Sequence, residues 1–125
     1  MKSGRKLFPV YTSRGIVAAV LQYPHLYNRQ GEWIGWVTQE RAVYAVDGRY
    51  VGRLSEEFRI LRRPSEDYSV PARRPPHPPG AIRMPSHFPL APMMPVLPSN
   101  LVDVLEEQPD LLPPLDAANN RNDTN

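Results

Sequence analysis

The chain has 125 residues, of which 16 are proline and none is cysteine, and its formal net charge is +2 at pH 7. This length suits one domain with one hydrophobic core. The lack of cysteine excludes disulfides, thiolate catalysis and cysteine-based metal sites, and it favours a reducing, cytoplasmic location. We find no apolar run long enough for a secretory signal or a membrane span.

Charge is distributed unevenly along the chain. Residues 1–83 hold 14 basic and 7 acidic residues, a net charge of +7, whereas residues 84–125 hold 1 basic and 6 acidic residues, a net charge of −5. The acidic part can fold back on the basic part, or the basic part can meet an anionic partner such as nucleic acid or a membrane surface. A mixed, solvated surface is the third interpretation, and the sequence leaves all three open.

Three repeat units without internal gaps organise the first half of the chain: Val10–Leu21, Leu26–Val37 and Val43–Leu54. Each unit has the order aliphatic, Tyr, three residues, Gly, three residues, Gly or Ala, one residue, aliphatic. The repeat-defining residues are Tyr11 and Gly15, then Tyr27, Gly31 and Gly35, then Tyr44, Gly48 and Gly52. The tyrosines are 16 and 17 residues apart, a spacing that suits one β-hairpin per unit and is too short for a propeller blade or a helical repeat.

Each unit contains the signals for its own hairpin. Tyrosine and β-branched residues before the first glycine favour extended chain, and that glycine accepts the positive φ of a tight turn. After the turn, alternate residues follow the order large, small, aliphatic, as in Trp33, Gly35 and Val37. We expect this face to point inward, with Trp33 in the core. The opposite face, which includes Ile34, Trp36 and Val51, is expected to meet water.

A fourth element, residues 58–63, alternates apolar residues with arginine imperfectly and stops before Pro64. It lacks the glycines of the other units, so it is either a degenerate closing strand or an open edge, and an open edge would favour a homo-oligomer. A single hairpin is marginal in water, so the units should combine. The predicted fold is all-β: short Tyr/Gly β-hairpin repeats forming a small flower-like or barrel-like array over residues 7–63, with a proline-rich extended tail.

The repeated Tyr-x-x-x-Gly-x-x-x-Gly-x-aliphatic unit, followed by a proline-rich segment, resembles the four-fold β-flower proteins, a family of small bacterial proteins. The resemblance covers about residues 7–63, and Ala19 stands where the repeat has glycine. It implies a shallow, symmetric β-array whose outline is similar to tubby-like and phospholipid scramblase-like barrels. The family brings no established activity and no catalytic residues.

Residues 64–98 contain 11 of the 16 prolines, a density that disfavours helix and sheet and favours extended polyproline II. From Pro89 to Pro98 a proline recurs at every third residue, which places these rings on one edge of a helix with three residues per turn. The residues between them are unexpectedly apolar. This pattern predicts either a docking segment for a partner or lipid surface, or a segment that completes the domain's own core.

The remaining elements are short. Arg73, Pro76 and Pro79 have the spacing that SH3-type grooves recognise. Residues 99–108 begin with Ser99 and have apolar residues at helical spacing, which predicts a short amphipathic helix. Residues 109–125 are predicted to form a disordered tail.

The sequence predicts no catalytic, cofactor-binding or metal-binding residue, because the three histidines lack ligand spacing and no phosphate-binding loop occurs. The first hypothesis is a non-enzymatic binding or structural module that contacts an unknown protein partner through the β-repeat face and the proline-rich tail. The candidate partner-binding residues are Trp36, Arg49, Arg53, Arg59, Arg62, Arg63, Phe88, Leu90, Met93 and Met94. The alternatives are a peripheral module on an anionic lipid surface and a nucleic-acid-binding module that uses the same arginines.

Overall fold

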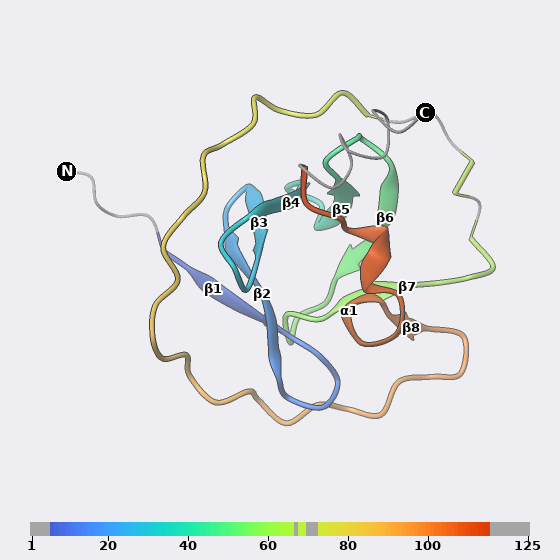
Figure 1. The fold of residues 1–125 in the computed structure, drawn as a ribbon. Helices are drawn as coiled ribbons and strands as arrows, with labels where there is room; N and C mark the ends of the chain where they lie inside the picture. Colours follow the sequence, from blue (N-terminus) through green and yellow to red (C-terminus); the bar gives the residue numbers. More distant parts are fainter. Residues whose placement is uncertain (1–5, 67, 70–72, 116–125) are drawn as a thin grey trace.

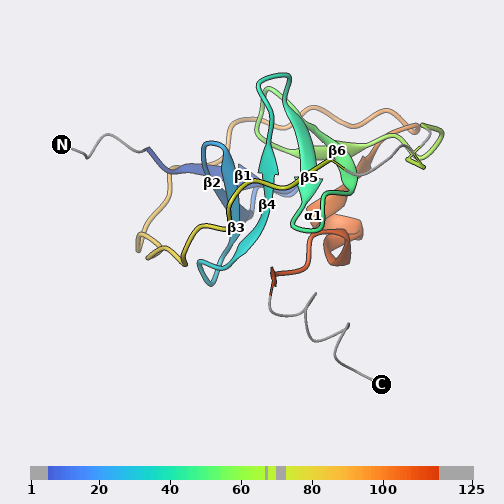
Figure 2. The same ribbon diagram turned by 90° about the horizontal axis from the view of Figure 1, so that it is seen from above.

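The computed structural model describes residues 6–66, 68–69 and 73–115. Eight antiparallel strands form a curled sheet in which each strand pairs with its neighbours in the sequence (Figures 1 and 2). The strands are β1 (Phe8–Tyr11), β2 (Val17–Gln22), β3 (His25–Asn28), β4 (Trp33–Val37), β5 (Ala42–Ala45), β6 (Tyr50–Leu54), β7 (Ile60–Arg62) and β8 (Val102–Asp103). A short helix α1 (Val104–Glu107) and a 3-10 turn η1 (Pro109–Leu111) follow β8. The predicted all-β class, a small hairpin array with a proline-rich extended segment, is confirmed.

Five of the hairpin turns share one hydrogen-bond pattern. In the first, the amide of Thr12 donates to the carbonyl of Ile16 at 2.8 Å and the amide of Gly15 donates to the carbonyl of Thr12 at 2.9 Å; the turns at 28–32, 38–42, 45–49 and 55–59 repeat this arrangement. The fourth of the five residues in each turn has a positive φ. In the three repeat units this residue is the first glycine of the repeat, at positions 15, 31 and 48. A tight turn followed by a left-handed residue is a common hairpin connection. The predicted role of the turn glycines is therefore confirmed.

Each repeat hairpin also contains a β-bulge that the sequence pattern does not reveal. Leu26 pairs with Gly35 but Tyr27 pairs with Trp33, so Ile34 has no partner of its own in β3. Val51 is skipped in the same way between β5 and β6. Because a bulge places two residues opposite one, the alternation of faces changes at that point. The prediction that Ile34 and Val51 meet water is wrong: both lie in the main core.

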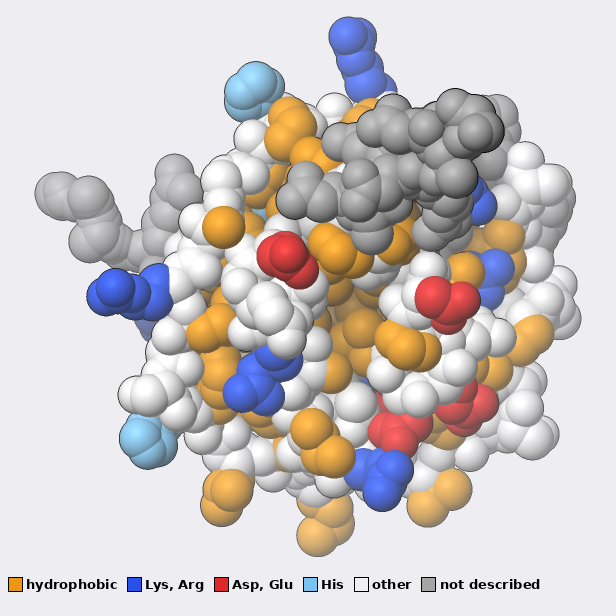
Figure 3. Space-filling view, in the orientation of Figure 1, with side chains coloured by type: hydrophobic (Ala, Val, Ile, Leu, Met, Phe, Trp, Pro, Cys, Tyr) orange, Lys and Arg blue, Asp and Glu red, His pale blue; other side chains and the backbone are white. Residues whose placement is uncertain are grey.

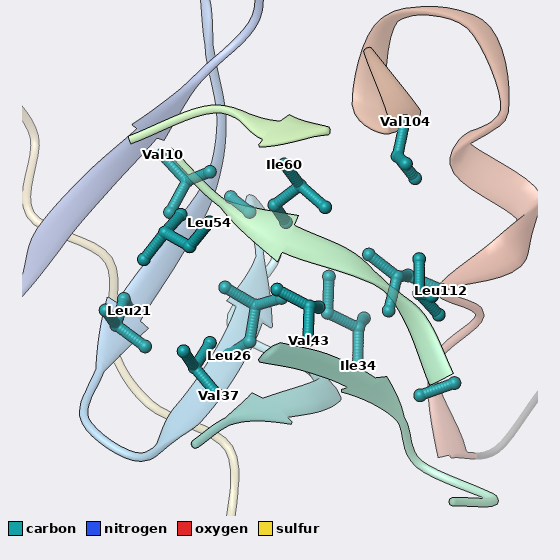
Figure 4. Close-up of a cluster of buried hydrophobic side chains, with 13 residues drawn as sticks. Val10, Leu21, Leu26, Ile34, Val37, Val43, Leu54, Ile60, Val104 and Leu112 are labelled. Carbon is teal, nitrogen blue, oxygen red and sulfur yellow. The ribbon is translucent and has the colours of Figure 1, made fainter. Parts of the chain in front are cut away.

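The main core joins all four repeat positions (Figure 4). The first strand of each hairpin contributes one aliphatic residue at an equivalent position. These residues are fully buried: Val10, Leu26, Val43 and Ile60. Burying a side chain of this size contributes roughly 1.5–3 kcal/mol. Ile60 therefore gives residues 58–63 the buried aliphatic position of the other units, and β7 pairs with both β6 and β8, so it is not an open edge.

The small residue in the middle of each unit allows neighbouring strands to approach closely. A Cβ atom on Gly35 would collide with the carbonyl oxygen of Tyr44 in β5, and one on Gly52 would collide with the carbonyl oxygen of Leu61 in β7. The expectation that the small residue leaves room for a crowded neighbouring strand is confirmed.

The fourth hairpin is formed by β7 and β8, and residues 63–101 separate its two strands. Residues 73–101 of this connection are called the strap. In Figure 1 the strap runs round the outside of the hairpin array before the chain returns to pair with β7. Within residues 99–108, where a short amphipathic helix was predicted, the structure has two strand residues at 102–103 followed by a helix of four residues.

The segment after the helix also differs from the prediction of a disordered tail from residue 109. Pro109–Leu111 forms η1, and Leu112 is buried in the main core. The apolar side chain of Leu112 fixes this segment, and the prediction for residues 116–125 lies outside the described residues.

Candidate interaction surfaces

The strap rests on the tips of the three tight hairpins in reverse order. The amide of Arg73 donates to the carbonyl of Gly48 at 2.8 Å, and the amide of Ile82 donates to the carbonyl of Gly31 at 3.1 Å. A Cβ atom added to Gly15 would lie 3.5 Å from the Cβ atom of Ala91. The three contact residues in the strap are spaced evenly along it, so one extended segment touches each repeat once.

Side-chain contacts hold the strap between these points. The hydroxyl of Tyr11 donates to the carbonyl of Pro89 at 3.0 Å. The guanidinium of Arg29 lies 5.5 Å from the centre of the Phe88 ring, and that of Arg73 lies 5.3 Å from the Tyr44 ring. Such cation–π contacts contribute about 0.5–1 kcal/mol at exposed sites.

The first half of the strap completes the domain's own packing. Ile82 and Met84 cover a second core cluster built from Tyr27, Trp33 and Trp36. Trp33 is a core residue as expected, although it belongs to this second cluster. The residues with SH3-ligand spacing, Arg73, Pro76 and Pro79, belong to the same half, and both prolines are half-buried.

The second half of the strap shows burial at every third residue. Phe88, Ala91, Met94 and Leu97 are half-buried, whereas the residues on either side of them are exposed. This period matches a polyproline II helix, which has three residues per turn. One edge faces the hairpins, one carries the prolines, and the third points away from the domain.

The outward edge consists of Leu90, Met93 and Val96, which are 96%, 93% and 95% exposed. These three residues are called the ridge. In Figure 3 hydrophobic side chains project along the lower edge of the molecule, where the strap crosses in Figure 1. Exposed large apolar side chains that are grouped on one surface mark interaction sites more often than isolated ones do.

A polar group, called the seam cluster, links the two ends of the sheet; its Arg59 and Asp103 are buried, and its other two members are half-buried. It consists of Ser13, Glu57, Arg59 and Asp103. One carboxylate oxygen of Asp103 accepts bonds from the amide and the hydroxyl of Ser13, both at 2.7 Å, and the other accepts from the amide of Glu106 at 3.3 Å, which caps α1. The hydroxyl oxygen of Ser13 is therefore engaged as a donor, and it also accepts from Arg59 at 3.0 Å.

Arg59 extends the seam cluster to the strap. Its guanidinium donates to the carbonyl of Pro95 at 3.1 Å and forms an ion pair with Glu57 at 3.1 Å. Burial raises the pKa of Glu57, but hydrogen bonds from Ser55 and Arg59, together with the charge of Arg59, outweigh it and hold that pKa below its ordinary value. The cluster therefore anchors the strap as well as the sheet.

Two of the predicted partner-binding residues are buried. Trp36 is only 6% exposed and stacks on Tyr44 at 5.2 Å, so its predicted exposure on the water face is wrong. Arg59 is buried in the seam cluster. The physical reason for both is that the strap and the C-terminal segment cover surfaces that the repeat alone would leave open.

The other predicted arginines are spread over the surface. Arg53 donates to the carbonyl of Glu40 at 2.6 Å, Arg49 pairs with Asp47 at 3.1 Å, and Arg63 is exposed. Arg62 donates to the carbonyl of Val51, and its guanidinium lies 3.6 Å from the centre of the Tyr68 ring.

Arg49 and Arg62 share a hollow of about 320 Å³ with Tyr50 and Tyr68. Burial, reinforced by the charge of Glu66, raises the pKa of Tyr50, and burial also raises that of Tyr68. Both phenols are therefore neutral hydrogen-bonding groups at neutral pH.

The apolar strap residues divide by edge. Phe88 and Met94 face the hairpins, whereas Leu90 and Met93 lie on the ridge. Val96 belongs with them and was missed as a candidate, although its three-residue spacing from Met93 is visible in the sequence. The structure thus brings Leu90 and Met93 together with Val96 on one outward apolar surface.

Comparison with family models, curated proteins and solved structures finds no match to this chain. Within the described ranges no helix has the length and apolar character needed to cross a membrane. Among those same residues no three histidine, cysteine, aspartate or glutamate side chains gather as metal ligands would.

Proposed function

We propose that this chain is a non-enzymatic, cytoplasmic protein-interaction module whose binding surface is the ridge on the strap. The observation that carries the proposal is the near-complete exposure of Leu90, Met93 and Val96 at three-residue spacing. The inner edge of the same segment is anchored to the hairpins, so these side chains project from a backbone that is already ordered. A pre-ordered ligand loses less conformational entropy on binding than a flexible one.

The chemistry of the strap favours a protein partner over lipid headgroups or nucleic acid. Residues 84–102 contain no lysine, arginine, aspartate or glutamate. Binding to phosphate groups relies on cationic side chains and weakens strongly with salt. An apolar edge beside a proline edge is instead the kind of surface that polyproline-binding grooves recognise.

The four equivalent buried positions and the shared turn geometry also support the resemblance to four-fold β-flower proteins. Under that proposal, the array is a scaffold with approximate four-fold repetition. The fourth hairpin of this chain then carries its interaction segment in place of a short turn.

The experiment that tests the proposal is affinity capture from a lysate of the source cell with the immobilised full chain. The ridge variant is Leu90→Ser/Met93→Ser/Val96→Ser, and the matched control is Arg74→Ser/Arg83→Ser/His87→Ser, which changes three exposed strap residues outside the ridge. We expect a captured protein that the wild type and the control recover and the ridge variant loses, with unchanged unfolding midpoints. Equal recovery by all three chains would contradict the proposal.

A further inference from the structure

The sulfur atoms of this chain all belong to methionine, because the sequence has four methionines and no cysteine. Three of the four, Met84, Met93 and Met94, lie on the strap, and Met1 lies outside the described residues. Oxidants convert methionine to methionine sulfoxide, which is polar where the thioether is apolar. The strap therefore carries the sulfur atoms of the described residues that a peroxide can oxidise.

The three strap methionines differ in how easily a small oxidant reaches them. Met93 is 93% exposed. Met94, its neighbour in the sequence, lies on the inner edge of the strap and is half-buried. Met84 is half-buried against the second core cluster, which includes Trp33 and Trp36. Because a peroxide must reach the sulfur atom in order to react with it, the fold favours oxidation of Met93 over the other two.

Met93 is the middle residue of the ridge. Leu90 and Val96 lie three residues away on either side, a separation of about 9 Å along a polyproline II helix. A sulfoxide oxygen accepts hydrogen bonds from water, and moving such a polar group into an apolar site is unfavourable. One oxidised side chain therefore interrupts the apolar edge at its centre. The inner edge of the strap keeps its contacts with the hairpins, because Met93 points away from them.

We propose that Met93 is an oxidation site, at which hydrogen peroxide converts the ridge from an apolar to a polar surface and weakens the binding of its partner. The effect on binding rests on the proposed function, that the ridge is a protein-binding surface. The preference for Met93 over Met84 and Met94 rests on burial alone.

The reaction needs only the thioether and the peroxide. A lone pair on the sulfur atom of Met93 attacks one oxygen of hydrogen peroxide, so an S–O bond forms while the O–O bond breaks. The proton on the transferred oxygen moves to the departing hydroxide, which leaves as water. The sulfur atom loses two electrons and the peroxide gains them, and the product is the sulfoxide.

The first measurement is oxidation of the full chain by dilute hydrogen peroxide, followed by mass spectrometry of fragments that separate Met93 from Met94. We expect sulfoxide to accumulate severalfold faster at Met93 than at Met84 or Met94. In urea, which unfolds the chain, the three rates should become similar, because the fold causes the difference. Equal rates in the folded chain, or faster oxidation of Met84 or Met94, would overturn the inference.

Two single substitutions then connect the loss of apolar surface to one sulfur atom. Met93→Leu keeps an apolar ridge without the thioether, and the matched control Met94→Leu removes the neighbouring thioether instead. We expect peroxide to reduce the retention of the wild type and of Met94→Leu on a phenyl hydrophobic-interaction column, and to change that of Met93→Leu much less. An equal reduction in all three chains would mean that the apolar surface is lost elsewhere, which contradicts the inference.

Affinity capture with oxidised chains tests the effect on binding. The oxidised wild type should bind the ridge-dependent protein at least about tenfold more weakly than the untreated chain, which corresponds to about 1.4 kcal/mol. Oxidised Met93→Leu should bind it as strongly as before. Unchanged binding by the oxidised wild type, or an equal loss in oxidised Met93→Leu, would overturn the inference.

The outcomes separate this inference from the proposed function. If peroxide oxidises Met93 selectively but no captured protein depends on the ridge, the proposed function fails and the oxidation site stands without an effect on binding. If capture depends on the ridge but Met93 is oxidised no faster than Met94, the inference fails and the proposed function stands.

Discussion

The first three repeat hairpins and the fourth differ in how the chain reverses direction. In the first three, a left-handed glycine turns the chain within a few residues. In the fourth, residues 63–101 separate β7 from β8, yet Ile60 keeps the same buried place as Val10 in the first unit. The comparison teaches that one hairpin loop can be lengthened into a strap with an exposed apolar edge without a change in the shared core.

We expect the largest loss of stability when the second strand of the fourth hairpin is removed. A chain that ends at Tyr68 lacks β8, and with it Val104 and Leu112 of the main core. Loss of a single buried side chain of this kind costs about 2–5 kcal/mol, against a typical total stability of about 5–15 kcal/mol. We expect the shortened chain to lose cooperative urea unfolding, followed by tryptophan fluorescence. A wild-type midpoint would show that the three tight hairpins fold without the fourth.

We expect a smaller loss of stability when the seam cluster is disrupted at Asp103. The substitution Asp103→Ala leaves the half-buried amide and hydroxyl of Ser13 without their acceptor and removes the cap of α1. An unsatisfied buried donor costs about 1–3 kcal/mol, and less where water reaches it, and a cap contributes about 1 kcal/mol, so we expect a loss of about 2 kcal/mol in the free energy of unfolding. The control is Asp110→Ala, at an exposed position of η1. Equal stability of the two variants would show that the seam cluster does not stabilise the fold.

Three glycine substitutions sharpen the comparison at the hairpin tips. Gly15→Ala should cost about 1 kcal/mol because its positive φ strains a side chain. Gly31→Ala should cost more, because its Cβ atom would also collide with the carbonyl oxygen of Ile82 in the strap. Gly80→Ala, with open space around it, should stay within about 0.5 kcal/mol of the wild type.

Hydrogen exchange of the Ile82 amide shows whether the strap has moved. We expect Gly31→Ala to expose this amide, which donates to Gly31 in the wild type, and Gly15→Ala to leave it protected. Unchanged protection in both variants would mean that the strap does not depend on the hairpin tip at Gly31.

The smallest effect is a dependence of stability on pH through Glu57. Its pKa is lower in the folded chain than in the unfolded chain, so its contribution is present above the unfolded pKa and is lost as the pH falls through the folded pKa. We expect the unfolding free energy of the wild type to fall in acid more steeply than that of Glu57→Gln. Parallel acid curves for the two chains would contradict the ion pair with Arg59.

The sequence predicts the repeated part of the fold well because each hairpin is specified locally. The turn glycines at 15, 31 and 48 and the buried aliphatic residue ahead of each turn follow from the repeat alone. The bulges at Ile34 and Val51 do not, because they come from the pairing between strands rather than from the residues of one strand. One extra residue in a pair is enough to reverse the predicted face.

The candidate site was predicted only in part because it depends on contacts between distant segments. Trp36 and Arg59 are buried by the strap, β8 and the C-terminal segment. The residues next to them in the sequence do not predict these contacts. The ridge is different. The three-residue period of this segment is visible in the sequence of residues 88–98. Which of its three edges faces outward depends on the contacts that the inner edge makes with the hairpin tips.

The length of the connection between β7 and β8 has a consequence for the order of folding. The three tight hairpins join residues that are near in sequence, and such hairpins form in about 1–10 μs. Pairing Leu61 with Asp103 closes a far longer loop, and the entropy of closure rises with loop length. We therefore expect the strap to settle last, onto hairpins already formed, and its closure to limit the rate of folding.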